Sequence, residues 1–133
     1  MTIAIDHMDH MVIYAGDLER TLDFYSRVLG MRVERKVNRP SSLHFGAQKF
    51  NVHTAGREFS PRAARAIAGS ADFCLIATTP IEQVVAHLAA CGVTLELGPV
   101  DRDGAVGTIR SVYFRDPDDN LVEVSNYPSS DRS

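Results

Sequence analysis

The sequence predicts an α+β fold assembled from two copies of a βαβββ unit. Laid over itself at a displacement of 62 residues, segment 10–33 matches segment 72–95 without a gap. In this register Gly30, which closes the first predicted helix, falls on Gly92. A second alignment, at a displacement of 70 residues, matches segment 51–53 with segment 121–123. Few residues are identical, so the two copies share a pattern of elements rather than a common sequence.

The first copy opens with a strand over about residues 8–14, because Met11 and Ile13 alternate with His10, Val12 and Tyr14. We expect one face of this strand to pack on a helix and the other to line a cleft. The helix follows at once, with Asp17 as its N-cap and Gly30 at its end. Its apolar stripe consists of Leu18, Leu22, Tyr25, Val28 and Leu29.

The second helix has its own start signal in Thr79-Pro80-Ile81-Glu82. We predict Thr79 as the N-cap, Pro80 at the first helical position and Glu82 as a capping-box carboxylate. The helix is expected to end at Gly92, and its apolar stripe consists of Ile81, Val84, Val85 and Leu88.

Three short strands are predicted after each helix, at about 31–37, 42–46 and 49–54 in the first copy and about 94–98, 109–115 and 120–125 in the second. We therefore expect one domain over 1–127, with modules at about 8–54 and 71–125. The apolar residues of segment 55–70 recur at neither helix nor strand spacing, so this segment is predicted to be a linker. The polar segment 128–133 is predicted to be a flexible tail.

Composition narrows the class of protein. With 133 residues and 44% hydrophobic content, the chain can bury a core of its own. A formal charge of −3 argues against nucleic-acid binding, and no apolar run approaches a membrane span. Residues 1–10 lack the features of a signal peptide, so we expect a cytoplasmic protein that binds a small molecule. Cys74 and Cys91 are expected to be buried free thiols.

The repeat pairs four polar residues, His10 with Asp72 and His53 with Glu123. If the copies pack about a pseudo-twofold axis, these side chains can converge on one point. Two imidazoles and two carboxylates form a mixed nitrogen and oxygen set that suits Zn²⁺, Ni²⁺, Fe²⁺ or Mn²⁺. The ordinary alternatives are a backbone-bonded strand histidine for His10 and a turn-capping carboxylate for Asp72.

Three motifs carry a family resemblance. They are His10 within Asp-His-Met-Val-Ile, Phe24-Tyr25 before Leu29-Gly30-Met31, and the closing run from Phe114 through Asp-Pro-Asp-Asp-Asn to Glu123. With the paired repeat, these motifs make the chain similar to the glyoxalase, bleomycin-resistance and extradiol-dioxygenase superfamily, also called vicinal oxygen chelate proteins. Segments 45–53, 69–72 and 123–127 resemble the glyoxalase domain-containing protein 5 group most.

The resemblance implies a curved half-barrel sheet that half-encloses a divalent metal, with His10, His53, Asp72 and Glu123 in the four ligand positions. Two of these depart from the family pattern, since glyoxalase I has a carboxylate where this chain has His53, and relatives usually have a histidine where it has Asp72. Asp119 replaces the usual glycine of the closing motif, at a turn expected to need a positive φ.

The leading functional interpretation is a metal-dependent, glyoxalase-like isomerase or lyase, in which Glu123 or Asp72 moves a proton on a substrate chelated through neighbouring oxygens. One alternative is an extradiol-type dioxygenase, with Fe²⁺ held by His10, His53 and Glu123. The other is a metal-free, drug-sequestering protein of the bleomycin-resistance kind. Tyr113 lies ten residues before Glu123, the position of the acid-base tyrosine of extradiol dioxygenases. An aromatic residue at this position could equally be part of the core. The resemblance further implies a homodimer.

Overall fold

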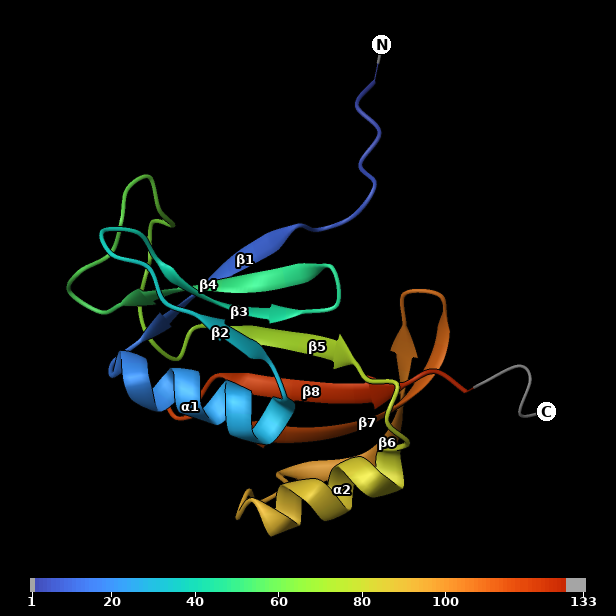
Figure 1. Ribbon diagram of the computed structural model, residues 1–133. Helices are drawn as coiled ribbons and strands as arrows, with labels where there is room; N and C mark the ends of the chain where they lie inside the picture. Colours follow the sequence, from blue (N-terminus) through green and yellow to red (C-terminus); the bar gives the residue numbers. More distant parts are fainter. Residues whose placement is uncertain (1, 129–133) are drawn as a thin grey trace. The chain divides into compact units, whose positions relative to one another are not determined.

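The computed structural model describes residues 2–128, which form two βαβββ units (Figure 1). One unit extends to Ala68 and the other begins at Gly69. The first contains β1 (His10–Ala15), α1 (Leu18–Leu29), β2 (Arg32–Glu34), β3 (Ser41–Phe45) and β4 (Gln48–Thr54). The second contains β5 (Asp72–Ile76), α2 (Ile81–Ala90), β6 (Leu97–Gly104), β7 (Gly107–Arg115) and β8 (Leu121–Asn126). The predicted α+β class and repeat are confirmed.

The first unit is a four-stranded sheet with α1 on one face. The strand order is β1-β4-β3-β2, with β1 parallel to β4 and the other neighbours antiparallel. Leu22, Tyr25 and Val28 of α1 are buried, as are Phe50 and Leu43 of the sheet. Each such side chain contributes about 1.5–3 kcal/mol when fully withdrawn from water. The opposite face of the sheet carries the polar residues of β1 and β4.

Helix α1 begins and ends where the sequence predicts. The Asp17 carboxylate accepts a hydrogen bond from the backbone N–H of Arg20 at 3.1 Å, which satisfies one of the open donors of the first turn. At the other end Gly30 has a φ of 70°, and its N–H donates to the carbonyl of Ser26. A left-handed residue at this position is the usual way to stop a helix.

The second unit repeats this topology, with strand order β5-β8-β7-β6 and α2 packed against β7. Val112 is paired with Val124 and Phe114 with Val122, so these four buried side chains share the face that α2 covers. Side chains alternate along a strand, and Ser111, Tyr113, Glu123 and Ser125 therefore lie on the opposite face.

The start of α2 differs from the prediction. Pro80 is the N-cap, no side chain caps the helix, and the Pro80 carbonyl accepts from the N–H groups of Gln83 and Val84. The Thr79 carbonyl accepts instead from Asn126 Nδ2 at 2.9 Å. A contact with the distant strand β8 thus fixes this segment, and the local capping box that the sequence predicts is wrong.

Strand β6 also differs from the prediction of a strand at 94–98. It runs from Leu97 to Gly104 and pairs with β7 as far as a turn between Gly104 and Gly107. Its charged segment Asp101-Arg102-Asp103 lies at the sheet edge, where polar side chains remain in water. Neither face of Asp101-Arg102-Asp103 is apolar, so the sequence pattern here is typical of a loop and does not predict a strand. None of the helices within residues 2–128 is long and apolar enough to span a membrane.

Candidate functional site

A cluster of polar side chains occupies the sheet face of the second unit opposite α2. Tyr113 and Cys74 are both paired with Glu123, and Ser111 is paired with Ser125. Paired residues on neighbouring strands point to the same side of a sheet, so these five side chains come together. We name this group, made of Cys74, Ser111, Tyr113, Glu123 and Ser125, the Glu123 cluster.

Serine hydroxyls hold the carboxylate of Glu123. Ser111 Oγ donates to Glu123 Oε2 at 2.6 Å, and Ser125 Oγ lies 3.4 Å from the same oxygen. The two hydroxyl oxygens are 2.6 Å apart, and both serines are fully buried. The half-buried carboxylate therefore has the hydrogen-bond partners that offset its desolvation, and its orientation is set from two neighbouring strands.

Tyr113 stands next to this carboxylate on the open face rather than in the core under α2. Its hydroxyl accepts from Arg102 Nε at 3.0 Å, and the Arg102 guanidinium lies 5.5 Å from the centre of the ring. Burial raises the pKa of Tyr113, and a hydrogen bond to Glu123 adds to this effect while Arg102 opposes it. The phenol therefore keeps its proton at neutral pH and can donate a hydrogen bond.

Asp72 and Cys74 extend the open face along β5. Asp72 is exposed and is paired with Leu121, two residues before Glu123 along β8. Cys74 is exposed rather than buried, which corrects the expectation from its apolar neighbours, and Cys91 is half-buried. Cys74 Sγ lies 3.3 Å from Ser125 Oγ, and partial desolvation raises the pKa of the thiol. This thiol is protonated at neutral pH, so it is not primed as a nucleophile.

His10 lies at the start of β1, on the open face of the first unit. Its Nδ1 is 2.8 Å from the carboxylate of Asp9, a contact that lowers the pKa of Asp9. When Nδ1 donates its proton to Asp9, the lone pair of Nε2 is left for another partner. Carboxylate contacts of this kind commonly orient histidines that bind metals.

His53 shares that face but is enclosed. Only 5% of it is exposed, and the rings of Tyr14 and Phe59 lie edge-on at 5.6 and 5.4 Å. Its buried Nδ1 has no hydrogen-bond partner among residues 2–128. Burial lowers the pKa of His53, and Glu58 only partly opposes this effect. The imidazole is therefore neutral at pH 7.

The strand registers change which residues correspond between the units. His10 is paired with Lys49 and Asp72 with Leu121, so the last strands are displaced by 72 residues and not by 70. By this measure the counterpart of Glu123 is Asn51, which the sequence reasoning missed. His53, paired with Tyr14, lies four positions along from the partner of His10, about 13 Å at ~3.3 Å per residue.

The donor types fit a divalent metal, although the described residues do not include a group of three or more His, Cys, Asp or Glu side chains positioned to hold one. The first unit offers the Nε2 atom of His10, oriented through Asp9, and the neutral imidazole of His53. The second unit offers Asp72 and the held carboxylate of Glu123. Nitrogen and oxygen donors of this kind suit Zn²⁺, Ni²⁺, Mn²⁺ or Fe²⁺.

Comparison with protein families finds one description for almost the whole chain. Residues 7–124 match the model of the Glyoxalase/Bleomycin resistance protein/Dioxygenase superfamily. Virulence protein STM3117 of Salmonella typhimurium is 48% identical over 124 residues, which are 92% of this chain and 85% of that protein. In its crystal structure the fold is similar with a TM-score of 0.92 and 44% identity, over 95% of this chain and all of the other.

Two further relatives are a glyoxalase domain-containing protein and a lactoylglutathione lyase. Glyoxalase domain-containing protein RDO1 of Mycosarcoma maydis is 43% identical over 125 residues, covering 94% of this chain and 70% of that protein. Lactoylglutathione lyase GLX1 of Arabidopsis thaliana is 32% identical, and the match covers 86% of this chain but 42% of the plant protein.

Proposed function

Because the chain belongs to the Glyoxalase/Bleomycin resistance protein/Dioxygenase superfamily, we propose that it is a metal-dependent, glyoxalase-like isomerase or lyase. Its substrate is a small molecule held through two neighbouring oxygens. The observation that carries this proposal is the Glu123 carboxylate, held by Ser111 on an open sheet face beside the protonated Tyr113. The lactoylglutathione lyase name of the Arabidopsis relative supports the same class of reaction.

We propose His10 and Glu123 as the core metal ligands, with Asp72 as an optional ligand or a base. His53 is the third ligand that the family resemblance implies, but the strand registers favour Asn51 at that position. A metal bound there would act as a Lewis acid on the two substrate oxygens. We further propose that the protein is a homodimer.

The Glu123 cluster and Asp72 supply the acid-base groups. Either Glu123, once the substrate displaces it as a ligand, or Asp72 accepts a proton from the carbon beside the substrate carbonyl, and the same carboxylate returns it to the neighbouring carbon. Ser111 keeps the carboxylate aimed through its 2.6 Å hydrogen bond. With substrate bound, the Tyr113 hydroxyl, oriented by Arg102, turns its proton from Glu123 to the substrate oxygen on which negative charge develops.

Metal titration of the wild-type protein and of a His10→Ala, Glu123→Ala double variant tests this proposal. We expect wild type to bind at least one of Zn²⁺, Ni²⁺, Mn²⁺ and Fe²⁺, and the double variant to bind it at least about 100-fold more weakly, since even supporting residues of metal sites contribute 10–100-fold. His87→Ala, which removes an exposed histidine of α2, is the matched control. Equal affinity in all three proteins would show that His10 and Glu123 bind no metal, and would favour the metal-free binding protein.

Single variants identify the remaining ligand. If Asn51 occupies the third position, Asn51→Ala weakens metal binding while His53→Ala does not, and the opposite result assigns His53. Sedimentation velocity at micromolar concentration tests the homodimer separately. A monomer at this concentration would contradict the proposed homodimer.

A further inference from the structure

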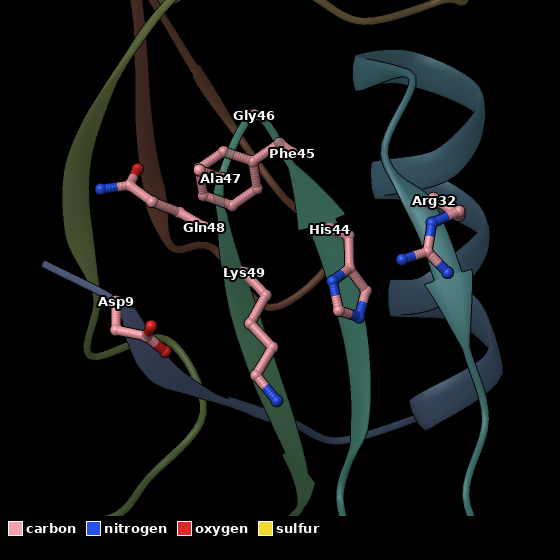
Figure 2. Close-up of a pocket in the computed structure, with 8 residues that line it drawn as sticks. All are labelled: Asp9, Arg32, His44, Phe45, Gly46, Ala47, Gln48 and Lys49. Atoms are coloured by element: carbon pink, nitrogen blue, oxygen red, sulfur yellow. The ribbon is translucent and has the colours of Figure 1, made fainter.

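The first unit has a pocket at the end of its sheet that the proposed chemistry does not use. It has a volume of about 440 Å³ and lies beside the hairpin that joins β3 to β4 (Figure 2). The residues that line it are Asp9, Arg32, His44, Phe45, Gly46, Ala47, Gln48 and Lys49. Most of these side chains are polar, and the pocket is open to solvent, so its occupant is a polar molecule or group.

Three nitrogen-bearing side chains stand in one row across this pocket. Arg32 on β2 is paired with His44 on β3, and His44 is paired with Lys49 on β4. Paired residues project from the same face of a sheet, and Figure 2 shows the His44 ring between the other two side chains. Arg32 and Lys49, on either side of His44, therefore place two positive charges on one face of the sheet, where both would attract an anion between them.

Arg32 and Lys49 differ from those cations of this chain that are paired with a carboxylate. Arg35 is bound to Glu19 at 2.6 Å, Arg110 to Asp101 at 3.2 Å and Arg115 to Glu96 at 2.9 Å. Neither the Arg32 guanidinium nor the Lys49 ammonium has a side-chain ion pair or hydrogen bond within the part of the chain that the structure describes. The pKa of Asp9 is lowered by His10 and to a smaller extent by Lys49, and that of Glu34 by Lys36 and to a smaller extent by Arg32, so these carboxylates act on the two cations without forming ion pairs with them.

The nearby carboxylates offset the charge of this row only in part, because each has a closer partner. Glu34 lies 3.7 Å from Lys36 and 3.3 Å from His44, and Lys36 is the main cause of its lowered pKa. Asp9 is bound to His10 at 2.8 Å. The His44 ring is fixed by Ser42 Oγ at 2.9 Å, and Gln48 donates to the Met8 carbonyl at 2.8 Å. The walls of the pocket are therefore held in place before any ligand arrives.

We propose that this pocket binds the anionic group, a carboxylate or a phosphate, of the substrate. Lys49 is the strand partner of His10, so an anion between Arg32 and Lys49 lies about 10 Å from His10, at ~4.8 Å between strands. The assignment to a substrate rests on the proposed function, whereas the pocket itself does not. It narrows the substrate to a small acid whose charged group is several bonds from the two chelated oxygens.

Titration of the metal-free protein with inorganic phosphate and with succinate, at low ionic strength and followed by two-dimensional amide NMR, tests the proposal. We expect saturable shifts at Gly46, Ala47 and Lys49. The ligand that binds more tightly distinguishes a phosphate site from a carboxylate site. Arg32→Gln and Lys49→Gln should each weaken binding about tenfold, the usual contribution of one charge-assisted hydrogen bond.

Arg20→Gln is the matched control, because it removes one exposed arginine of the same unit far from the row in sequence. Binding of both anions in Arg32→Gln that equals binding in the control would overturn the proposal, as would the absence of any saturable shift at the pocket. The His10→Ala, Glu123→Ala double variant should keep anion binding even if it binds no metal. Failure of the metal site and failure of the anion pocket are therefore separate results.

Discussion

Replacement of Asn120 by alanine should destabilise the second unit strongly, because this side chain joins the β7–β8 turn to the start of β5. Only 1% of Asn120 is exposed. Its Nδ2 donates to Asp116 Oδ2 at 2.7 Å, and its Oδ1 accepts from the backbone N–H of Ala71 at 2.9 Å. Ala71 precedes Asp72, so the same contact fixes one end of the candidate site.

The expected cost follows from these two bonds. A hydrogen bond to a charged group contributes about 1.5–3 kcal/mol and a neutral one about 1 kcal/mol, and the buried Asp116 carboxylate loses a partner. The sum is about 3 kcal/mol. For a chain of 133 residues this corresponds to a fall in Tm of about 10 °C.

Urea unfolding followed by circular dichroism measures the effect. Asn51→Ala is the matched control, since Asn51 is a half-buried strand residue on the open face and its loss should change stability by less than about 1 kcal/mol. A double-mutant cycle with Asp116→Ala should show that the two losses are not additive. The reasoning is refuted if Asn120→Ala and Asn51→Ala have the same midpoint of unfolding with unchanged m-values.

Three further outcomes are expected. Gly98→Ala should lower the free energy of unfolding by about 3 kcal/mol or more, because φ of Gly98 is 110° and the new Cβ would lie 2.4 Å from the Ser111 carbonyl oxygen. A melting temperature within 2 °C of wild type, which corresponds to about half a kcal/mol, would contradict this. His53 has a lowered pKa in the folded state, so the unfolded chain binds its proton first and stability falls as pH drops below about 6.5. His53→Phe should therefore lose less stability than wild type between pH 7 and pH 5 in urea titrations, and an equal loss would sink the argument. Because φ of Asp119 is 67°, Asp119→Gly should be neutral or stabilise the protein by up to about 1 kcal/mol, and Asp119→Val should destabilise it. If differential scanning calorimetry gives the valine variant a higher melting temperature than the glycine variant, this φ is not maintained.

Features with a local cause could be predicted from the sequence. Helix α1 begins after Asp17 and ends before Gly30 because each residue supplies a backbone interaction of its own. Asp119 has the positive φ that its place in the closing motif predicts.

Features that depend on distant contacts could not be predicted in this way. The start of α2 depends on Asn126, and β6 is a strand because β7 pairs with it. The partners of Glu123 were missed, although a signal was present: Ser111 and Ser125 keep the same alternation with buried valines as Tyr113 and Glu123. Only the strand pairing shows that these serines approach the carboxylate.

The difference in hairpin length between the units has a consequence for how this fold can diversify. The first unit turns from β3 to β4 through Gly46 and Ala47, whereas the second uses residues 116–120 between β7 and β8. A strand that slides by two residues moves its side chains about 7 Å along the sheet and keeps each on the same face. A slide of one residue would place Asn51 under α1 and expose Phe50. The longer turn of the second unit takes up its three additional residues, whereas a two-residue shift of register would exchange the residue that faces a ligand without rebuilding the core, so that ligand recognition and stability can vary independently.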